Sequence, residues 1–375
     1  MLSQTGNPFP FLSMKILQLS LAFTFLIYAS HAAKPKRLTD ADLPWPPTLP
    51  DGKKVVTDKS PEFLKGTDTL REGVVIAKEA PTIDFLFYPE QDYPGKPWSN
   101  WGDGCLANGK YYSGIGDHYA IGRGENKYGN GEALAYEYDP KTKNFRALVK
   151  VSKFLDLPND HYAPGKIHSR IDMGSDGWLY YATHRGSSRA TVDANHYKGD
   201  WIFCTNPKSG KTEVVATAPI PKHCIPNSVL DPERMIFYGG TAPGSNAENQ
   251  EIQFFAYDIK KRKLLYRCDN GPARYIILAQ STGKLYYVPG AHGGGAKDGS
   301  PVVQYDLKTR TRKVLAFLHP FYESKYGFIP KGTYSTEISE EGDKLFITWN
   351  TSRGVRAWDC CGLTVVHIPK SERMP

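Results

Sequence analysis

The residues best suited to chemistry are histidines and arginines that stand next to tyrosine-rich segments. His168, Arg170 and Asp172 alternate in the string KIHSRID, so on a regular β-strand they would share one face. His184 and Arg185 follow in THRG, sixteen residues after His168, a spacing that suits a strand and its returning neighbour. We therefore predict that the two histidines and the two arginines face one channel.

Similar loops after other aromatic segments add two further histidines. His118 lies in GDHYAIGRG and His292 in PGAHGGG, and glycine-rich backbone of this kind can approach a ligand closely. Inner segments add Asn227 in CIPNSVL and Tyr334 in TYSTEIS. The predicted catalytic residues are His168, His184 and Tyr334. The predicted substrate-binding residues are Arg170, Arg185, His118, His292 and Asn227.

These residue types fit an acidic sugar as the substrate. Arginine can hold a carboxylate or sulfate through two parallel hydrogen bonds. A neutral histidine can take the proton next to a carboxyl group, and a tyrosine can return a proton to the leaving oxygen. The combination predicts β-elimination of a uronate-containing polysaccharide, which is the reaction of a polysaccharide lyase. The alternative is a non-catalytic module that binds a glycan or a protein.

Two other chemistries stay open. Glycoside hydrolysis needs two carboxylates across the scissile bond, and the candidates are Asp103, Asp117, Asp172 and Glu337. A divalent metal could be held by histidines around one channel, with His118, His168, His184 and His292 as candidates. Calcium is a separate option through aspartate-rich loops. The chain contains no GxSxG, HExxH or P-loop motif, and the glycines of GIGDHYAIGRG lead into a loop, which argues against a dinucleotide site.

The elements that must position these residues come from a unit that repeats about every 50 to 70 residues. Its first part is a turn and an aromatic strand, expected at 107–117, 175–186, 231–244, 281–293 and 340–354. Its second part is a hairpin with a polar turn, expected at 134–149, 200–217, 253–268 and 302–317. With an inner strand added, each unit has four antiparallel strands, as in a propeller blade. The predicted fold class is therefore all-β, a β-propeller of four-stranded blades.

The propeller is predicted to be closed by strands from both ends of the chain. Five repeats are recognisable, and the last ends at 363–369 without a fourth strand. Residues 74–89 precede the first unit and are expected to supply that strand, which would remove exposed sheet edges. Six or seven blades stay open if the connections at 152–167 and 319–333 contain further strands. The alternative architecture is a pair of β-sandwiches.

The N-terminal region predicts export. Residues 14–33 contain a lysine, an uncharged run from Ile16 to Tyr28 and small residues up to Ala33, the pattern of a secretory signal peptide. The run of thirteen residues is too short to span a bilayer, and a membrane anchor is the alternative interpretation. A secreted or periplasmic protein is therefore expected. The predicted regions are a signal peptide at 1–33, a proline-rich arm or linker at 34–69 and the propeller at 70–375.

Composition supports this architecture and leaves the activity open. The 375 residues include 23 Tyr, 35 Gly and 28 Pro, a mixture typical of short strands joined by turns. The formal net charge of +8 favours anionic ligands, whereas the absence of long Lys/Arg runs argues against nucleic acid as a partner. The 6 cysteines of an exported chain permit about fifteen disulfide pairings, and their spacing selects none of them.

Three strings resemble a family of exported bacterial propeller proteins of unassigned activity. They are KIHSRIDMGSDGWLYYATHRG, WSNWGDGCLANGKYYSGIGDH and LTVVHIPKSER, within a resemblance that covers about residues 70–375. The resemblance implies the propeller fold and export. Paired histidines with arginine and tyrosine are also distantly similar to propeller polysaccharide lyases of the ulvan and oligogalacturonate type, which use a His or Tyr base and an Arg clamp. That similarity implies such roles for His168, His184 and Arg170.

Overall fold

The structure is a computed structural model that describes most of the chain from residue 49 to residue 368. The described residues are 49–90, 100, 102, 104–116, 132–280, 282–291, 295–296, 301–317, 324, 330–339, 341–351 and 361–368. The predicted signal peptide lies outside them. Four predicted site residues also lie outside them, namely Asp103, Asp117, His118 and His292.

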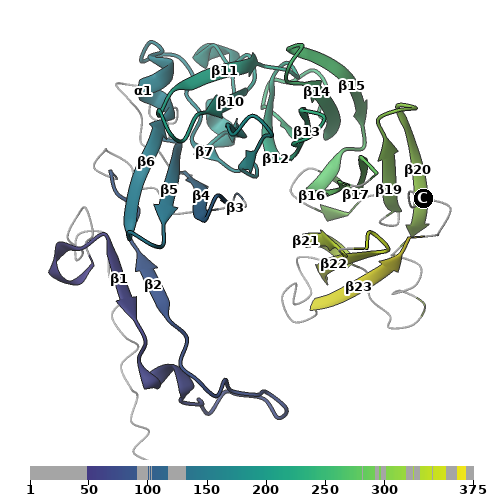
Figure 1. Ribbon diagram of the computed structural model, residues 1–375. Helices are drawn as coiled ribbons and strands as arrows, with labels where there is room; N and C mark the ends of the chain where they lie inside the picture. The colour runs from purple at the N-terminus through teal and green to yellow at the C-terminus, as the bar shows by residue number, and fades with distance from the viewer. Residues whose placement is uncertain are drawn as a thin grey trace, which may run out of the picture. The chain divides into compact units, whose positions relative to one another are not determined.

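Five antiparallel sheets follow one another along the described chain (Figure 1). The first contains β3 (Cys105–Ala107), β4 (Lys110–Ile115), β5 (Leu134–Asp139) and β6 (Asn144–Lys150). The second contains β7 (Lys166–Ile167), β8 (Asp172–Met173), β9 (Leu179–His184), β10 (Trp201–Thr205) and β11 (Thr212–Thr217). The third contains β12 (His223–Asp231), β13 (Ile236–Pro243), β14 (Gln253–Asp258) and β15 (Lys263–Asp269).

The last two sheets follow the same plan. The fourth contains β16 (Pro272–Ala279), β17 (Lys284–Ala291), β18 (Gly295–Ala296), β19 (Pro301–Asp306) and β20 (Thr311–Phe317). The fifth contains β21 (Pro330–Ile338), β22 (Lys344–Thr351) and β23 (Cys361–His367). In every sheet the strand order follows the chain, with β7 and β8 both beside β9, and β18 beside β17. The aromatic strands and hairpins therefore lie where the repeat predicts them.

Apolar side chains join each sheet to the next in chain order. Phe237 and Phe255 of the third sheet pack against the second sheet, whereas their neighbours Tyr238 and Phe254 pack against the fourth. Successive residues of a strand point to opposite faces, so these strands are buried on both sides. Further clusters join the first sheet to the second and the fourth to the fifth. Sheets stacked in this way are propeller blades, and the predicted fold class is confirmed.

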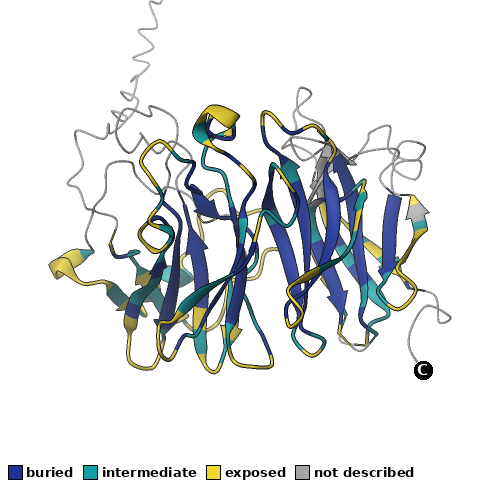
Figure 2. Cartoon of the chain, turned by 90° about the horizontal axis from the view of Figure 1, so that it is seen from above, coloured by how far each residue is buried: buried dark blue, intermediate teal, exposed yellow. Residues whose placement is uncertain are grey.

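The outer hairpins turn on aspartate side chains. Asp139 Oδ1 accepts hydrogen bonds from the backbone N–H groups of Lys141 and Thr142, and Asp306 Oδ1 accepts one from the N–H of Lys308. This local bonding is the reason that aspartate suits such corners. Burial is concentrated in the strands and exposure in the turns between them (Figure 2).

β1 (Val55–Asp58) and β2 (Ile83–Leu86) form a separate two-stranded sheet. Val55 and Leu86 pack with Tyr138 and Phe145 of the first blade. In the described part of the chain, β23 pairs with β22 alone. The prediction that residues 74–89 supply the fourth strand of the last sheet is therefore wrong.

The physical reason for this difference is a nearer partner for β2. β1 pairs with β2 over its whole length, from Val55 opposite Leu86 to Asp58 opposite Ile83. Asp84 adds a hydrogen bond from Thr57 Oγ1 at 2.6 Å. β1 belongs to the segment predicted to be an arm, so part of that arm pairs with a strand on the other side of the predicted boundary.

The helices in the described part of the chain are short. The α-helix α1 (Val151–Leu155) opens the connection to the second sheet, which then continues as turns, with no strand before β7. The 3₁₀ turns are η2 (Pro50–Gly52), η3 (Pro61–Leu64), η4 (Ser188–Ala190) and η5 (Asp193–Asn195). None of the helices in the described ranges has the length and apolar character needed to cross a membrane.

Candidate functional site

The inner strand of the second sheet is broken in two. β7 and β8 both pair with β9, and the chain between them leaves the sheet. Within this break the Ser169 hydroxyl donates to the Ala182 carbonyl oxygen at 2.9 Å and accepts from the Ala182 N–H at 2.7 Å. The side chain thus takes the place of a backbone partner. Regular alternation from His168 to Asp172, which the sequence analysis assumed, does not hold here.

His168 and His184 lie next to each other at this break. His184 is the Cα partner of Lys166 at the end of β9, and its ring centroid lies 5.2 Å from that of His168. The two ring planes are tilted by 39°, and both side chains are half-buried. The structure therefore brings together the two histidines to which the sequence analysis assigns catalysis.

Backbone carbonyl groups determine the tautomer of both rings. His168 Nδ1 lies 2.7 Å from the Pro226 carbonyl oxygen, and His184 Nδ1 lies 2.7 Å from that of Arg185. A carbonyl oxygen can only accept, so each Nδ1 carries a hydrogen. In the neutral rings the lone pair is then on Nε2. An imidazole in this tautomer can accept a proton at Nε2, which a general base must do.

Positive charge accumulates around the two histidines. Lys166 is buried, with 4% of its surface exposed. Burial, together with the charges of Arg185 and Arg274, lowers the pKa of Lys166 to about 7. Burial and the charge of Lys166 also lower the pKa of His168 to about 3 and that of His184 well below its usual range. Near neutral pH both rings are therefore neutral, and the lysine beside them is only partly protonated.

This basic cluster, Lys166, His168, His184, Arg185 and Arg274, draws on more than one blade. Arg274 belongs to β16 of the fourth sheet. Lys166 lies on β7, His168 follows it in the break, His184 ends β9, and Arg185 comes next in the loop. Arg185 Nη1 also donates a hydrogen bond to the Pro243 carbonyl oxygen of the third sheet. The second and fourth blades thus contribute charge to one place, and the third blade contributes a carbonyl oxygen.

A buried carboxyl group lies near Arg185. Asp200 is fully buried and accepts hydrogen bonds from the hydroxyl groups of Thr183, Tyr162 and Tyr197, at 2.7, 3.0 and 3.3 Å. Burial raises the pKa of Asp200 to about 7, while the hydroxyl groups and the charge of Arg185 act in the opposite direction. Asp200 is therefore only partly ionised near neutral pH and can change the charge around Arg185 there.

Glycines of the first blade allow its backbone to lie against the basic cluster. Gly116 forms an isolated β-bridge with Lys166, and a Cβ atom at Gly116 would lie only 1.8 Å from Lys166 Cβ. A Cβ atom at Gly114 would lie 2.6 Å from the Ile167 side chain. The string GIGDH therefore needs glycine at both positions. His118, a predicted site residue outside the described ranges, comes two residues after Gly116.

Arg170 and Asp172 belong to a different set of contacts. Arg170 Nε lies 2.7 Å from Asp172 Oδ1, and Asp172 Oδ2 accepts a hydrogen bond from the Leu230 N–H at 2.9 Å. Both residues line a cavity of about 480 Å³ together with Glu337, and neither histidine of the pair lines it. Two of the carboxylates considered for hydrolysis thus share a cavity, although both oxygens of Asp172 already have protein partners.

The other predicted residues, Asn227 and Tyr334, lie on inner strands of the third and fifth sheets. Asn227 is buried on β12, close to Gly240 of β13, and its Oδ1 has no hydrogen-bond partner among the residues that the structure describes. Tyr334 lies within β21, and its side chain is outside the description. Four cysteines are free thiols, namely Cys105, Cys204, Cys224 and Cys268.

The sequence analysis did not select Lys166 or Asp200. Lys166 stands two residues before His168 in KIHSRID, and that spacing puts two strand residues on one face. It is a signal that the sequence contains. Asp200 belongs to no motif, because its partners Tyr162 and Tyr197 reach it only in the folded chain.

A metal is disfavoured at the histidine pair. Lys166, Arg185 and Arg274 repel a cation there, and both Nδ1 atoms are bound to carbonyl oxygens. In the described ranges, the group of side chains with metal-ligand spacing lies elsewhere, at Asp160, His161 and His196.

No protein-family model matches this chain, and no curated protein matches it. Among solved structures, oligogalacturonate lyase from Vibrio parahaemolyticus has a TM-score of 0.44 at 10% identity, covering 78% of this chain and 70% of that chain. The Dos1 propeller has a TM-score of 0.41 at 14% identity, covering 72% of this chain and 56% of that chain.

TolB from Acinetobacter baumannii has a TM-score of 0.38 at 11% identity, covering 63% of this chain and 46% of that chain. The chain thus spans less than half the length of TolB. TM-scores this low support no functional argument, so the function has to be inferred from the site.

Proposed function

We propose that this chain is an exported, carbohydrate-active propeller that binds an acidic polysaccharide and cleaves it by β-elimination. The observation that supports this best is the basic cluster around His168 and His184. Burial and neighbouring positive charge lower the pKa values of Lys166, His168 and His184, which means that a proton on any of these groups raises the energy of the folded state. A bound carboxylate would offset that cost, because it stabilises the protonated lysine and the arginines.

The perturbed pKa values also favour a functional role over a purely structural one. Buried groups with strongly shifted pKa values gather at sites that bind or react. The site combines a lysine with a pKa of about 7 and two neutral histidines whose lone pair is on Nε2. These are the groups that proton transfer next to a carboxylate requires.

In the proposed reaction Arg185 and Lys166 hold the uronate carboxylate. Nε2 of one histidine takes the proton from the sugar carbon next to the carboxylate. The electron pair of that C–H bond then forms a double bond to the neighbouring carbon. The bond from that carbon to the glycosidic oxygen breaks, and the oxygen takes up a proton, for which Tyr334 is the proposed acid. The products are an unsaturated uronate and a new chain end.

Glycan binding without catalysis is the second candidate. The low pKa values of His168 and His184 favour it, because weakly basic histidines take a carbon-bound proton slowly. A bound carboxylate would raise the pKa of a nearby imidazole, which would make the histidine a stronger base and favour catalysis. The two candidates therefore differ in what happens after the polymer binds.

The test uses the purified full chain with polygalacturonate, alginate and a carboxyl-reduced polygalacturonate as the neutral control. The proposal expects ultraviolet absorbance from the unsaturated product with at least one acidic polymer and none with the neutral one. Binding of acidic polymers without any absorbance would leave the non-catalytic candidate. Equal binding of the neutral control, or no binding at all, would contradict both.

A further inference from the structure

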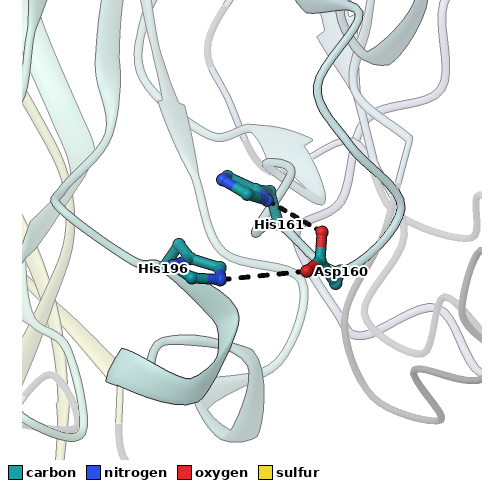
Figure 3. A group of neighbouring side chains, drawn as sticks. All are labelled: Asp160, His161 and His196. Carbon is teal, nitrogen blue, oxygen red and sulfur yellow. Dashed lines mark hydrogen bonds and ion pairs between the residues drawn. The ribbon is translucent and has the colours of Figure 1, made fainter.

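A second polar cluster lies at the protein surface, formed by Asp160, His161 and His196 (Figure 3). His161 Nδ1 lies 2.9 Å from Asp160 Oδ1, and His196 Nε2 lies 3.9 Å from Asp160 Oδ2. The two imidazole rings are stacked, with centroids 4.2 Å apart and planes 19° apart. One potential ligand atom from each of the three residues lies within 4.8 Å of the others.

The two loops that carry this cluster are tied together by the backbone. The N–H of Tyr162 donates to the carbonyl oxygen of Asn195 at 2.7 Å, so the residues before His196 and after His161 are directly bonded. His196 itself has a left-handed backbone conformation, with φ at 54°. The two imidazole rings therefore face each other because the backbone holds them in place, as well as because of their side-chain rotamers.

Each histidine is followed by a tyrosine that anchors it. Tyr162 and Tyr197 are buried, their rings meet edge to face with centroids 4.6 Å apart, and both hydroxyl groups donate to Asp200. In both His-Tyr pairs the tyrosine is thus held inside and the histidine stays accessible. This arrangement holds the two histidines near each other before any ligand arrives.

We propose that Asp160, His161 and His196 bind a divalent transition metal ion, with Zn²⁺ as the representative. Two imidazole nitrogens and one carboxylate oxygen form a donor set that suits zinc, nickel or copper better than calcium or magnesium, which prefer oxygen ligands. The side chains are 72%, 35% and 51% exposed for Asp160, His161 and His196, so a metal ion can reach all three.

Metal binding would replace the hydrogen bond between His161 and Asp160. Zinc lies about 2.0–2.2 Å from its nitrogen and oxygen ligands and holds them in tetrahedral directions, so neighbouring donor atoms lie about 3.4 Å from one another. The present separations of 2.9 and 3.9 Å require only small rotations of exposed side chains. With three protein ligands, the remaining coordination positions would be taken by water.

A metal at this position would connect the loop before β7 to the loop before β10. A ligand that binds only the folded chain stabilises it, by an amount that grows with metal concentration. We expect the connection to slow exchange of the Tyr162 amide hydrogen, since that N–H forms the bond between the two loops. Zinc should therefore increase the stability of the folded chain and slow hydrogen exchange at the Tyr162 amide.

The experiment uses the untagged full chain, because a histidine tag would bind the same ions. Thermal unfolding is measured with Zn²⁺ alone, with Ca²⁺ alone and without added metal. We expect Zn²⁺ to raise the midpoint by about 3 °C and Ca²⁺ to leave it unchanged. His161→Ala, His196→Ala and Asp160→Asn should each lose most of the rise, measured against their own metal-free midpoints.

Two matched histidine variants serve as controls. His367→Ala removes an exposed histidine from β23, and His168→Ala removes one from the basic cluster. Both should keep the full response to Zn²⁺. The proposal is overturned by an absent response in the unaltered chain, by a response that survives His161→Ala and His196→Ala, or by an equal effect of Ca²⁺. Zn²⁺ should slow hydrogen exchange of the Tyr162 amide in the unaltered chain. It should not do so in Asp160→Asn, a variant that keeps both histidine rings and loses only the carboxylate.

Discussion

Two stretches of the inner strand of the second blade, Lys166–His168 and Arg170–Asp172, carry ionisable groups in different surroundings. In the first stretch burial and neighbouring positive charge lower the pKa values of Lys166 and His168. In the second stretch Arg170 lies 2.7 Å from the Asp172 carboxylate, which also accepts a backbone hydrogen bond. Ser169 separates the two, since its side chain bonds to β9 where the strand is interrupted.

Basic residues of one short string thus have opposite effects on the energy of the folded state. Positive charge at buried Lys166 raises the energy of the folded state until an anion binds, whereas the ion pair of Arg170 lowers it. We therefore expect changes in the first stretch to act mainly on ligand affinity and turnover. Changes in the second should act mainly on stability, and binding by Arg170 stays a separate prediction.

The largest effect is expected from the histidines of the first stretch. His168→Ala or His184→Ala should lower turnover of an acidic polymer by about a hundredfold or more, because one of them is the proposed base. The affinity for the polymer should change much less. Initial rates of absorbance increase measure turnover, and His367→Ala is the control. Full activity in both variants would contradict the proposed roles.

The next effect concerns Asp172. Asp172→Ala should lower the free energy of unfolding by about 2 kcal/mol, because it removes a partner of Arg170 and the acceptor of the Leu230 N–H. Urea titration measures this change. Asp68→Ala alters an exposed aspartate and should leave stability within about 0.5 kcal/mol. If the two variants were equally stable, the contrast between the stretches would not hold.

A smaller effect is expected from the buried lysine. Lys166→Met should weaken binding of an acidic oligosaccharide by about tenfold through the loss of one positive charge, without lowering stability. Calorimetric titration measures the affinity, and Lys141→Met in an exposed turn is the matched control. An unchanged affinity would remove Lys166 from the proposed site. An equal loss for a neutral oligosaccharide would point to a change in shape instead.

The smallest effect is the dependence of binding on pH. The pKa of Lys166 is about 7 in the free protein, and a bound carboxylate should raise it. Between these two values the complex holds a proton that the free protein lacks, so affinity should fall as pH rises through this window. We expect a fall of about fivefold from about pH 6.5 to about pH 8.

The experiment must distinguish the titration of Lys166 from that of the groups around it. In this range His168 and His184 stay neutral and Arg185 stays charged, whereas ionisation of Asp200 would also weaken anion binding. Calorimetry in two buffers of different ionisation enthalpy measures the proton uptake. Lys166→Met should reduce the uptake more than Asp200→Asn does. Uptake that is unchanged in Lys166→Met would assign the titration to another group.

The blade repeat could be predicted from the sequence because each part of it depends on short distances. Aspartate turns such as that at Asp139 close over three or four residues, and neighbouring residues such as Phe237 and Tyr238 must both be apolar when a strand is buried on both faces. The closing strand could not be predicted in the same way. The pattern of residues 82–89 predicts a strand but does not indicate its partner, which in the folded chain is β1.

For the site, the residue types and the proximity of His168 and His184 could be predicted from the sequence, since sixteen residues suit a strand and its returning neighbour. Only the folded chain shows that Lys166 and Arg274 join them, and that Tyr162 and Tyr197 meet at Asp200. The physical reason is that local spacing governs turns and strand pairs, whereas burial, charge accumulation and contacts between blades arise only when distant inner strands are packed side by side.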